Sequence, residues 1–191
     1  SSPSDQWIGD SYNIRPELAD QTSVGYSRNF ENNTYELGAE VYYKRMQNQL
    51  DYKDGTNINT IADVESSLLY GVGRAYGFEF LLKKKIGLFS GWISYTLSKT
   101  ERKIDGINEG NWYNAKQDRT HDVSIVTILE LNSKWTISGV FVYSTGNAVT
   151  FPTGKYALGE QTIYQYANRN ANRMPDYHRL DLSAQQFGHC A

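Results

Sequence analysis

The stretch TYELGAEVYYKRMQNQLDYKDG (residues 34–55) indicates the fold class. Apolar and polar side chains alternate along it: Leu37 and Val41 share one face, and Glu36 and Glu40 share the other. Alternation with a period of two is typical of a β-strand with one apolar and one polar face. Two pairs of environments fit such a strand. Its faces could meet a protein core and bulk water, or lipid and a water-filled lumen.

Composition excludes several classes of function. Lys and Arg number 19 against 21 Asp and Glu, which gives a formal charge of −2. The chain therefore lacks the basic footprint of a nucleic-acid-binding protein, and no nucleic acid is expected as a partner. The single cysteine, Cys190, allows neither an intrachain disulfide nor a cysteine-based metal site. The 15 tyrosines, against 7 Phe and 4 Trp, suit surfaces that are wet on one side and apolar on the other.

The rest of the chain repeats the alternation and carries few helical signals. Runs of β-branched and aromatic residues between turn residues predict an all-β fold, an antiparallel up-and-down meander. The seven predicted strands are Thr22–Phe30, Thr34–Tyr52, Gly71–Lys84, Leu88–Lys103, Arg119–Leu131, Trp135–Phe151 and His178–Gln186. The strand from Arg119 is the least regular, because residues 123–129 are apolar on both faces apart from Ser124 and Thr127.

Short and long connections alternate along the chain. The short ones are ENN (31–33), KIG (85–87) and NSK (132–134), and the long ones are Lys53–Tyr70, Ile104–Asp118 and Pro152–Tyr177. This alternation places all short turns at one end of the sheet and all long loops at the other. Strands of about 10 residues or more, joined in this way, are typical of a transmembrane barrel with short periplasmic turns and longer extracellular loops. We therefore expect the Tyr35 face to meet lipid and the Glu36 face to meet water or a plug; a soluble sandwich is the alternative.

Four motifs resemble the C-terminal barrel of TonB-dependent outer-membrane receptors. They are NIRPELADQTSVGYSRNF (13–30), GRAYGFEFLLKKKIGLFSGWISYTLSKTER (73–102), WYNAKQDRTHDVSIV (112–126) and NRMPDYHRLDLSA (172–184), in the family's order. The resemblance covers nearly the whole chain from Asn13. It points to the receptor type that carries an N-terminal carboxypeptidase-regulatory-like domain.

The resemblance implies a large barrel of about 22 strands closed by an N-terminal plug, in the outer membrane of a Gram-negative bacterium. It also implies active import. An extracellular ligand such as a siderophore, cobalamin, a glycan or a peptide binds the loops and the plug, and the TonB–ExbB–ExbD complex then pulls on the plug. The other partners that it implies are outer-membrane lipid and a surface lipoprotein.

The chain departs from the family pattern in two ways. It has no plug or TonB-box region, and it ends QQFGHCA where the family continues to a terminal aromatic residue. We expect a fragment of the barrel wall, with residues 1–12 as a preceding segment, residues 13–186 as the partial barrel and residues 187–191 as an atypical tail of the kind that truncation leaves. Seven strands leave two open edges, so the fragment alone is not expected to transport. The alternative is a non-transporting outer-membrane or soluble β-sheet ligand-binding module.

Clusters that suggest catalysis have simpler structural interpretations. DRTHD (118–122) sets His121 beside two aspartates, but Ser124 shares a face with Asp122 rather than with His121. No nucleophile-elbow pattern occurs in the sequence. His178, flanked by two further aspartates, receives the same interpretation. We expect hydrogen-bonded structural clusters and no enzyme.

Signals for metals and cofactors are also weak. The histidines, His121, His178 and His189, lack the spacing of a zinc site. DYKDGTNIN (51–59) offers oxygen ligands but lacks the terminal Glu of an EF-hand loop, so calcium is not favoured. GVGRAYG (71–77) continues into a strand rather than a helix, which argues against a dinucleotide loop. We expect no cofactor and no metal, and glycines that let a neighbour or the plug come close.

Residues for ligand contact are expected on the two later long loops. The candidates are Trp112, Tyr113, Asn114, Tyr156, Tyr164, Tyr166 and Arg169. Aromatic faces stack on sugars or planar chelates, and Arg pairs with carboxylates. The competing interpretation, which is favoured, is that these side chains pack the loops and form the extracellular aromatic girdle.

Overall fold

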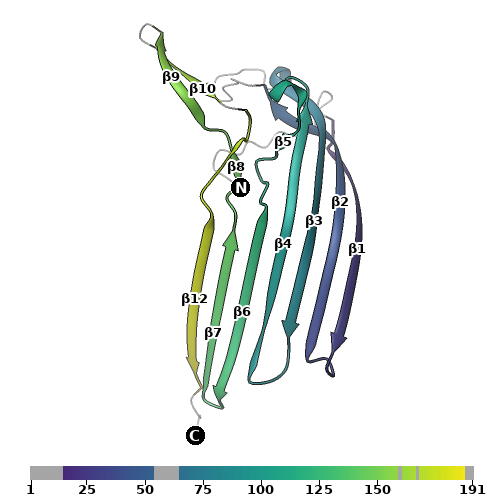
Figure 1. Ribbon diagram of the computed structural model, residues 1–191, viewed down its shortest axis with the longest axis vertical. Helices are drawn as coiled ribbons and strands as arrows, with labels where there is room; N and C mark the ends of the chain where they lie inside the picture. The colour runs from purple at the N-terminus through teal and green to yellow at the C-terminus, as the bar shows by residue number, and fades with distance from the viewer. Residues whose placement is uncertain (1–14, 54–64, 159–160, 167, 188–191) are drawn as a thin grey trace.

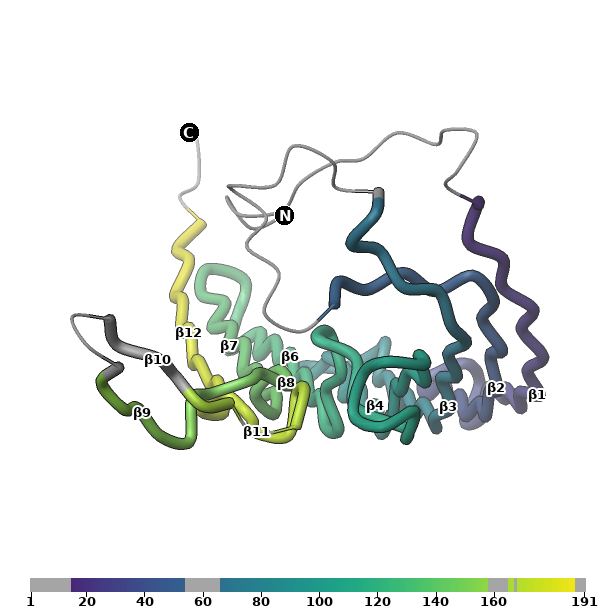
Figure 2. The backbone as a smooth tube through the Cα atoms, turned by 90° about the horizontal axis from the view of Figure 1, so that it is seen from above, coloured from purple at the N-terminus to yellow at the C-terminus, as the bar shows by residue number. Residues whose placement is uncertain are grey.

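The protein is built around one antiparallel sheet (Figure 1). The computed structural model describes residues 15–53, 65–158, 161–166 and 168–187. The seven long strands are β1 (Leu18–Phe30), β2 (Tyr35–Tyr52), β3 (Leu68–Lys84), β4 (Phe89–Ile104), β6 (His121–Asn132), β7 (Trp135–Ser144) and β12 (Tyr177–Gln186). They lie in the order β1-β2-β3-β4-β6-β7-β12, and Figure 2 shows them side by side in a curved row. The predicted all-β antiparallel meander is confirmed.

All seven predicted strands are present, and one of them ends well before its predicted end. β7 ends at Ser144, whereas the sequence predicted a strand as far as Phe151. That extension is wrong because the backbone of Gly146 lies against the backbone of Met174, which takes the chain out of the sheet. The residues beyond it form a separate ladder of two short strands, β8 (Ala148–Val149) and β11 (Asn172–Arg173).

The three short connections lie together at one end of the sheet, as predicted (Figure 1). In the first, Asn32 and Asn33 have positive φ angles of 53° and 67°, a backbone conformation that asparagine adopts more readily than most residues. In the third, Asn132 Oδ1 accepts the N–H groups of Lys134 at 2.9 Å and Trp135 at 3.0 Å. Local hydrogen bonds of this kind fix a tight turn without help from the rest of the fold.

The two faces of the sheet divide as the alternation predicted. Across β2, β3 and β4, the register aligns Val41 with Phe78 and Leu97 on one face, which we call the outer face. One residue along, Glu40 lies opposite Glu79 on the other face, which we call the inner face. Val41 and Leu97 are 52% and 41% exposed. Within the described part of the chain, no second layer therefore covers the apolar outer face.

The weak alternation of apolar and polar residues along β6 is explained by an apolar patch on the inner face. Its residue Val126 lies in register with Trp92 of β4 and Val140 of β7. The inner face therefore has an apolar patch at this place, while Ile125 continues the apolar outer face between Ile93 and Phe141. A strand that contributes to both surfaces loses the simple alternation.

The loop end of the sheet carries several small elements. They are η1 (Glu65–Ser67), η2 (Asn108–Gly110), β5 (Tyr113–Asn114), the β8–β11 ladder, β9 (Pro152–Leu158) and β10 (Gln161–Tyr166). β9 and β10 form a hairpin that projects beyond the sheet (Figure 1). The core here is small and consists of Ile104, Ile107 and Tyr113, with Leu69 packed against it. None of the described helices is long and apolar enough to span a membrane.

Some sequence expectations fall outside the described residues. These are the preceding segment 1–12, the first two residues of the motif that begins at Asn13, residues 54–59 of the candidate calcium loop, His189, and the end of the tail with Cys190.

Candidate functional site

Asp51, near the end of β2, joins two long loops to the sheet. Its Oδ1 accepts a hydrogen bond from Arg169 Nη1 at 2.6 Å, and its Oδ2 accepts the Tyr113 hydroxyl at 2.9 Å. Arg169 Nη2 also donates to the carbonyl of Tyr52 at 2.9 Å. The side chains of Asp51 and Arg169 are only 17% and 19% exposed. Water therefore screens this ion pair weakly.

Tyr113 connects this ion pair to the small core of the loop end. Its ring packs with Ile104 and Ile107, and the residue is 5% exposed. Burial, followed by the charge of Asp51, raises the pKa of the Tyr113 hydroxyl well above its usual range. The hydroxyl therefore stays protonated and donates to Asp51 throughout the physiological pH range.

Three asparagines complete the connections between the loops. Asn108 Oδ1 accepts the backbone N–H of Arg169 at 2.8 Å. Asn114 and Asn170 exchange hydrogen bonds, since each side-chain amide donates to the other residue's carbonyl, at 3.2 Å and 2.8 Å. We call Asp51, Asn108, Tyr113, Asn114, Arg169 and Asn170 the loop cap. Because its members come from the end of β2 and from the second and third long loops, the loop cap fastens these two loops to each other and to the sheet.

The DRTHD segment separates into two structural contacts. Asp118 is 1% exposed and forms an ion pair with Arg173, whose Nη1 also donates to the carbonyl of Gly146 at 3.1 Å. His121 lies elsewhere, with its Nδ1 2.9 Å from the hydroxyl of Tyr95. These contacts are those of a hydrogen-bonded structural cluster and not of an aligned acid, base and nucleophile.

Asp176 fastens the loop that precedes β12. Its carboxylate accepts the Tyr143 hydroxyl at 2.6 Å and the backbone N–H of Gly146 at 3.1 Å. These two hydrogen bonds, that from Tyr143 first, hold the pKa of the Asp176 carboxyl below its usual value. The two aspartates near His178 have different partners. Asp176 binds Tyr143 and Gly146, whereas Asp181 pairs with Arg179 at 2.7 Å.

The predicted ligand-contact residues fall into two groups. Tyr113, Asn114 and Arg169 belong to the loop cap, where their side chains contact other parts of the chain. The others lie outside it. The ring of Trp112 lies beneath the Arg74 guanidinium, 4.2 Å from the ring centre. Tyr156 and Tyr166 are exposed on the β9–β10 hairpin, and Tyr164 lies on β10 but its side chain is outside the described part of the structure. Tyr156 and Tyr166 are 55% and 60% exposed. The hairpin therefore offers the aromatic faces that are free to meet a ligand.

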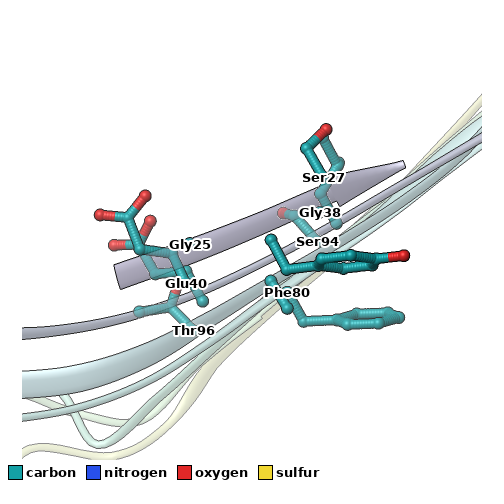
Figure 3. Close-up of a pocket in the computed structure, with 11 residues that line it drawn as sticks. Gly25, Ser27, Gly38, Glu40, Phe80, Ser94 and Thr96 are labelled. Carbon is teal, nitrogen blue, oxygen red and sulfur yellow. The ribbon is translucent and has the colours of Figure 1, made fainter. Parts of the chain in front are cut away.

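The inner face carries a shallow hollow, shown in Figure 3. Its floor is made of small residues on this face, Gly25, Ser27, Gly38, Ser94 and Thr96. Two carboxylates, Glu40 and Glu79, lie beside them in register. In Figure 3 Glu40 projects to the side of the strands opposite to Phe80. Small side chains leave room for a neighbouring body on the inner face, and the two acids favour a basic one.

Sequence reasoning missed four residues that organise the loop end: Asp51, Asn108, Asn170 and Arg173. Each has a partner far away in the sequence, at separations of 55 to 118 residues. No local pattern could have identified them.

No metal site accompanies this network. The described residues contain no group of three or more His, Cys, Asp or Glu side chains that could hold a metal ion.

The sequence was found to match a known protein family. A family model described as "TonB dependent receptor-like, beta-barrel" matches residues 2–188, which is nearly the whole chain. No curated protein and no solved structure matches the sequence.

Proposed function

The chain belongs to the family of TonB-dependent receptor-like β-barrels, and on that premise we propose that it forms part of the wall of a receptor that imports its ligand with energy transduced by TonB. Proteins of this family are receptors and transporters of the outer membrane of Gram-negative bacteria, not enzymes. Our proposal goes beyond family membership in two respects: the chain serves the import of a ligand, and TonB supplies the energy for it. Residues 13–186 would form the wall, residues 1–12 the segment before it and residues 187–191 the tail.

The observation that carries the proposal is the exposed apolar outer face. Val24, Val41 and Leu97 lie in one continuous row across β1 to β4 and are 70%, 52% and 41% exposed. Burying such a surface in lipid removes it from water, at about 25 cal/mol per Å². A wall that spans the outer membrane uses this face, whereas a soluble module would leave it in water.

The edges of the sheet support a larger barrel. β1 pairs only with β2, and β12 pairs only with β7, in the described part of the chain. Unpaired strand edges are not tolerated in the hydrocarbon region, because their backbone groups find no hydrogen-bond partners there. We propose that further strands complete the wall to a barrel of receptor size, about 22 strands. The wall alone would not transport.

The inner hollow supports a plug. Glu40 and Glu79 lie opposite each other in the register, so their two negative charges repel. A basic part of the plug would fit beside them and relieve this repulsion. We propose that the TonB–ExbB–ExbD complex acts on the wall only through this plug. From the sequence motifs we also propose the receptor type with an N-terminal carboxypeptidase-regulatory-like domain. A surface lipoprotein above the loops remains a further proposed partner.

Ligand contact is proposed for the hairpin tyrosines. Tyr156, Tyr166 and, by its place on β10, Tyr164 would stack on a sugar, a planar chelate or a peptide side chain. Trp112 would contribute at the edge of the sheet. Tyr113, Asn114 and Arg169 would act by holding the loops in place around the ligand.

An uptake experiment tests the proposal. Cells that produce the intact receptor are given labelled ferric siderophores, cobalamin, glycans and peptides in turn, with TonB present or deleted. The proposal predicts accumulation of one of these compounds that requires both the receptor and TonB. Binding at the cell surface without accumulation would favour the alternative, a non-transporting binding protein. Accumulation that is independent of TonB would contradict energy coupling.

A further inference from the structure

The β9–β10 hairpin forms a ribbon that stands apart from the main sheet. In the described part of the chain, β9 and β10 pair only with each other, and they project beyond the main sheet (Figure 1). Each of them therefore has one edge whose backbone groups meet no neighbouring strand of the described residues. A two-stranded ribbon is at best marginally stable in water, and a third strand stabilises it. An edge of this ribbon is thus a place where a strand from outside the chain can pair.

The two edges of the ribbon differ in their suitability for pairing. β9 begins with Pro152, which has no N–H group to donate, and it carries the exposed Lys155. Proline and lysine on an edge strand are common protections against pairing with another chain. β10 has the sequence QTIYQY, with no proline and no charged residue. Four of its six residues are Thr, Ile or Tyr, which favour strands. The edge of β10 is therefore the one that is left open to pairing.

The two exposed tyrosines of the hairpin serve opposite faces of the ribbon. The register pairs Tyr156 with Ile163, so these two positions share a face. Tyr166 lies three residues beyond Ile163 on β10, and an odd separation along a strand reverses the face. The register shift at this end adds Thr153 to β9 and leaves the alternation of β10 unchanged. The ribbon therefore presents one exposed aromatic ring on each side.

We infer that the edge of β10 binds an extended peptide as a third strand of the ribbon. In this mode main-chain hydrogen bonds give affinity, and side chains that alternate between the two faces give specificity. Alternate residues of the added strand lie on the side of Tyr156, and the residues between them lie on the side of Tyr166. A single sugar or planar chelate stacks on one face, so it uses only one of the rings. The inference rests on the ligand-contact role proposed above for this hairpin, but not on import or on TonB.

The test measures peptide binding to the purified intact receptor in detergent, in the absence of TonB. The probe is a dye-labelled, uncharged octapeptide of Thr, Val, Gln and Ser, and fluorescence anisotropy gives its affinity. One control peptide has N-methyl groups on alternate residues, which leaves it one pairing edge, and a second has them on all residues, which leaves none. The receptor variants are Tyr156→Ser and Tyr166→Ser, made singly, and the matched control is Lys155→Gln on the same hairpin.

We expect the fully N-methylated peptide to bind about 100-fold more weakly than the probe, because it loses about three main-chain hydrogen bonds to β10. The peptide that is N-methylated on alternate residues should keep most of the affinity, since it pairs through its remaining edge. Each tyrosine substitution should weaken binding about threefold, and Lys155→Gln should leave it unchanged. Hydrogen exchange of backbone amides should slow in β10 when the probe binds, with less change in β9.

Several results would overturn the inference. They are undetectable binding of the probe, equal affinity for the probe and the fully N-methylated peptide, slower exchange in β9 rather than in β10, and loss of affinity in only one of the two tyrosine variants. The last result would assign the hairpin to a ligand stacked on one face. Failure of the proposed function gives a different result, which is peptide binding without TonB-dependent accumulation. Accumulation of a sugar without any peptide binding would contradict this inference alone.

Discussion

The guanidinium of Arg169 lies 2.6 Å from the carboxylate of Asp51, across 118 residues of sequence. This ion pair connects the end of β2 with the loop that leads to β12, so it joins opposite parts of the sheet at its loop end. The Tyr113 hydroxyl, bound to the same carboxylate, adds a second long loop. Two loops that could move separately are thereby held together on the end of β2.

Removing Arg169 should loosen this connection. Arg169→Ala leaves the carboxylate of Asp51 poorly compensated, and we expect a loss of about 1–3 kcal/mol in the free energy of unfolding, since the pair is largely but not fully buried. Urea unfolding in detergent micelles measures it. The matched control is Arg179→Ala, whose pair with Asp181 is exposed and should contribute less than about 1 kcal/mol. Equal effects of the two substitutions would contradict the role assigned to Arg169.

A methyl group at residue 146 should disturb the point where the chain leaves the sheet. A Cβ added to Gly146 would overlap the carbonyl group of Met174. Gly146→Ala should therefore cost about 1–3 kcal/mol, as overpacking does elsewhere. The control is Gly154→Ala on the projecting hairpin, where the nearest heavy atom would be 3.8 Å away. Thermal unfolding of the two variants distinguishes them, and an unchanged melting temperature for Gly146→Ala would contradict the close packing.

Acidification should release the loop before β12. The hydrogen bonds from Tyr143 and Gly146 hold the pKa of Asp176 below its value in the unfolded chain. The stabilisation is therefore complete above the unfolded pKa, near 3.8, and is lost as the pH falls through the lower pKa of the folded state. The pH dependence of unfolding between pH 6 and pH 2 should be reduced in Asp176→Asn. An identical dependence in both proteins would refute this assignment.

The hairpin tyrosines should control affinity rather than the maximum rate of uptake. The double substitution Tyr156→Ser with Tyr166→Ser removes two exposed aromatic faces without disturbing the sheet. We expect the half-saturating concentration of the imported compound to rise about tenfold, as loss of two aromatic contacts would give. Lys155→Gln on the same hairpin serves as the control and should have little effect. An unchanged half-saturating concentration in the double variant would move the ligand site away from this hairpin.

The strands could be predicted from the sequence because their pattern is local. Alternation along residues 34–55 and polar turns such as Asn32 and Asn132 report the sheet and its short connections within a few residues. The end of β7 could not be predicted, because it depends on Gly146 meeting Met174, nearly thirty residues later. The loop cap could not be predicted either, because its contacts join residues that are far apart in the sequence. Asp51 gives no sign in the sequence that its partners are Tyr113 and Arg169.

Collision measurements on spin labels test most directly whether the apolar outer face meets lipid. With Cys190 replaced by serine, single cysteines at Val41 and Phe78 on the outer face, and at Glu40 and Glu79 on the inner face, are labelled in the membrane-inserted protein. We predict that labels 41 and 78 collide mainly with oxygen, which concentrates in lipid, and that labels 40 and 79 collide less with oxygen. Outer-face labels that collide mainly with a water-soluble nickel chelate, or with neither reagent, would contradict a lipid-facing wall and favour a soluble sandwich.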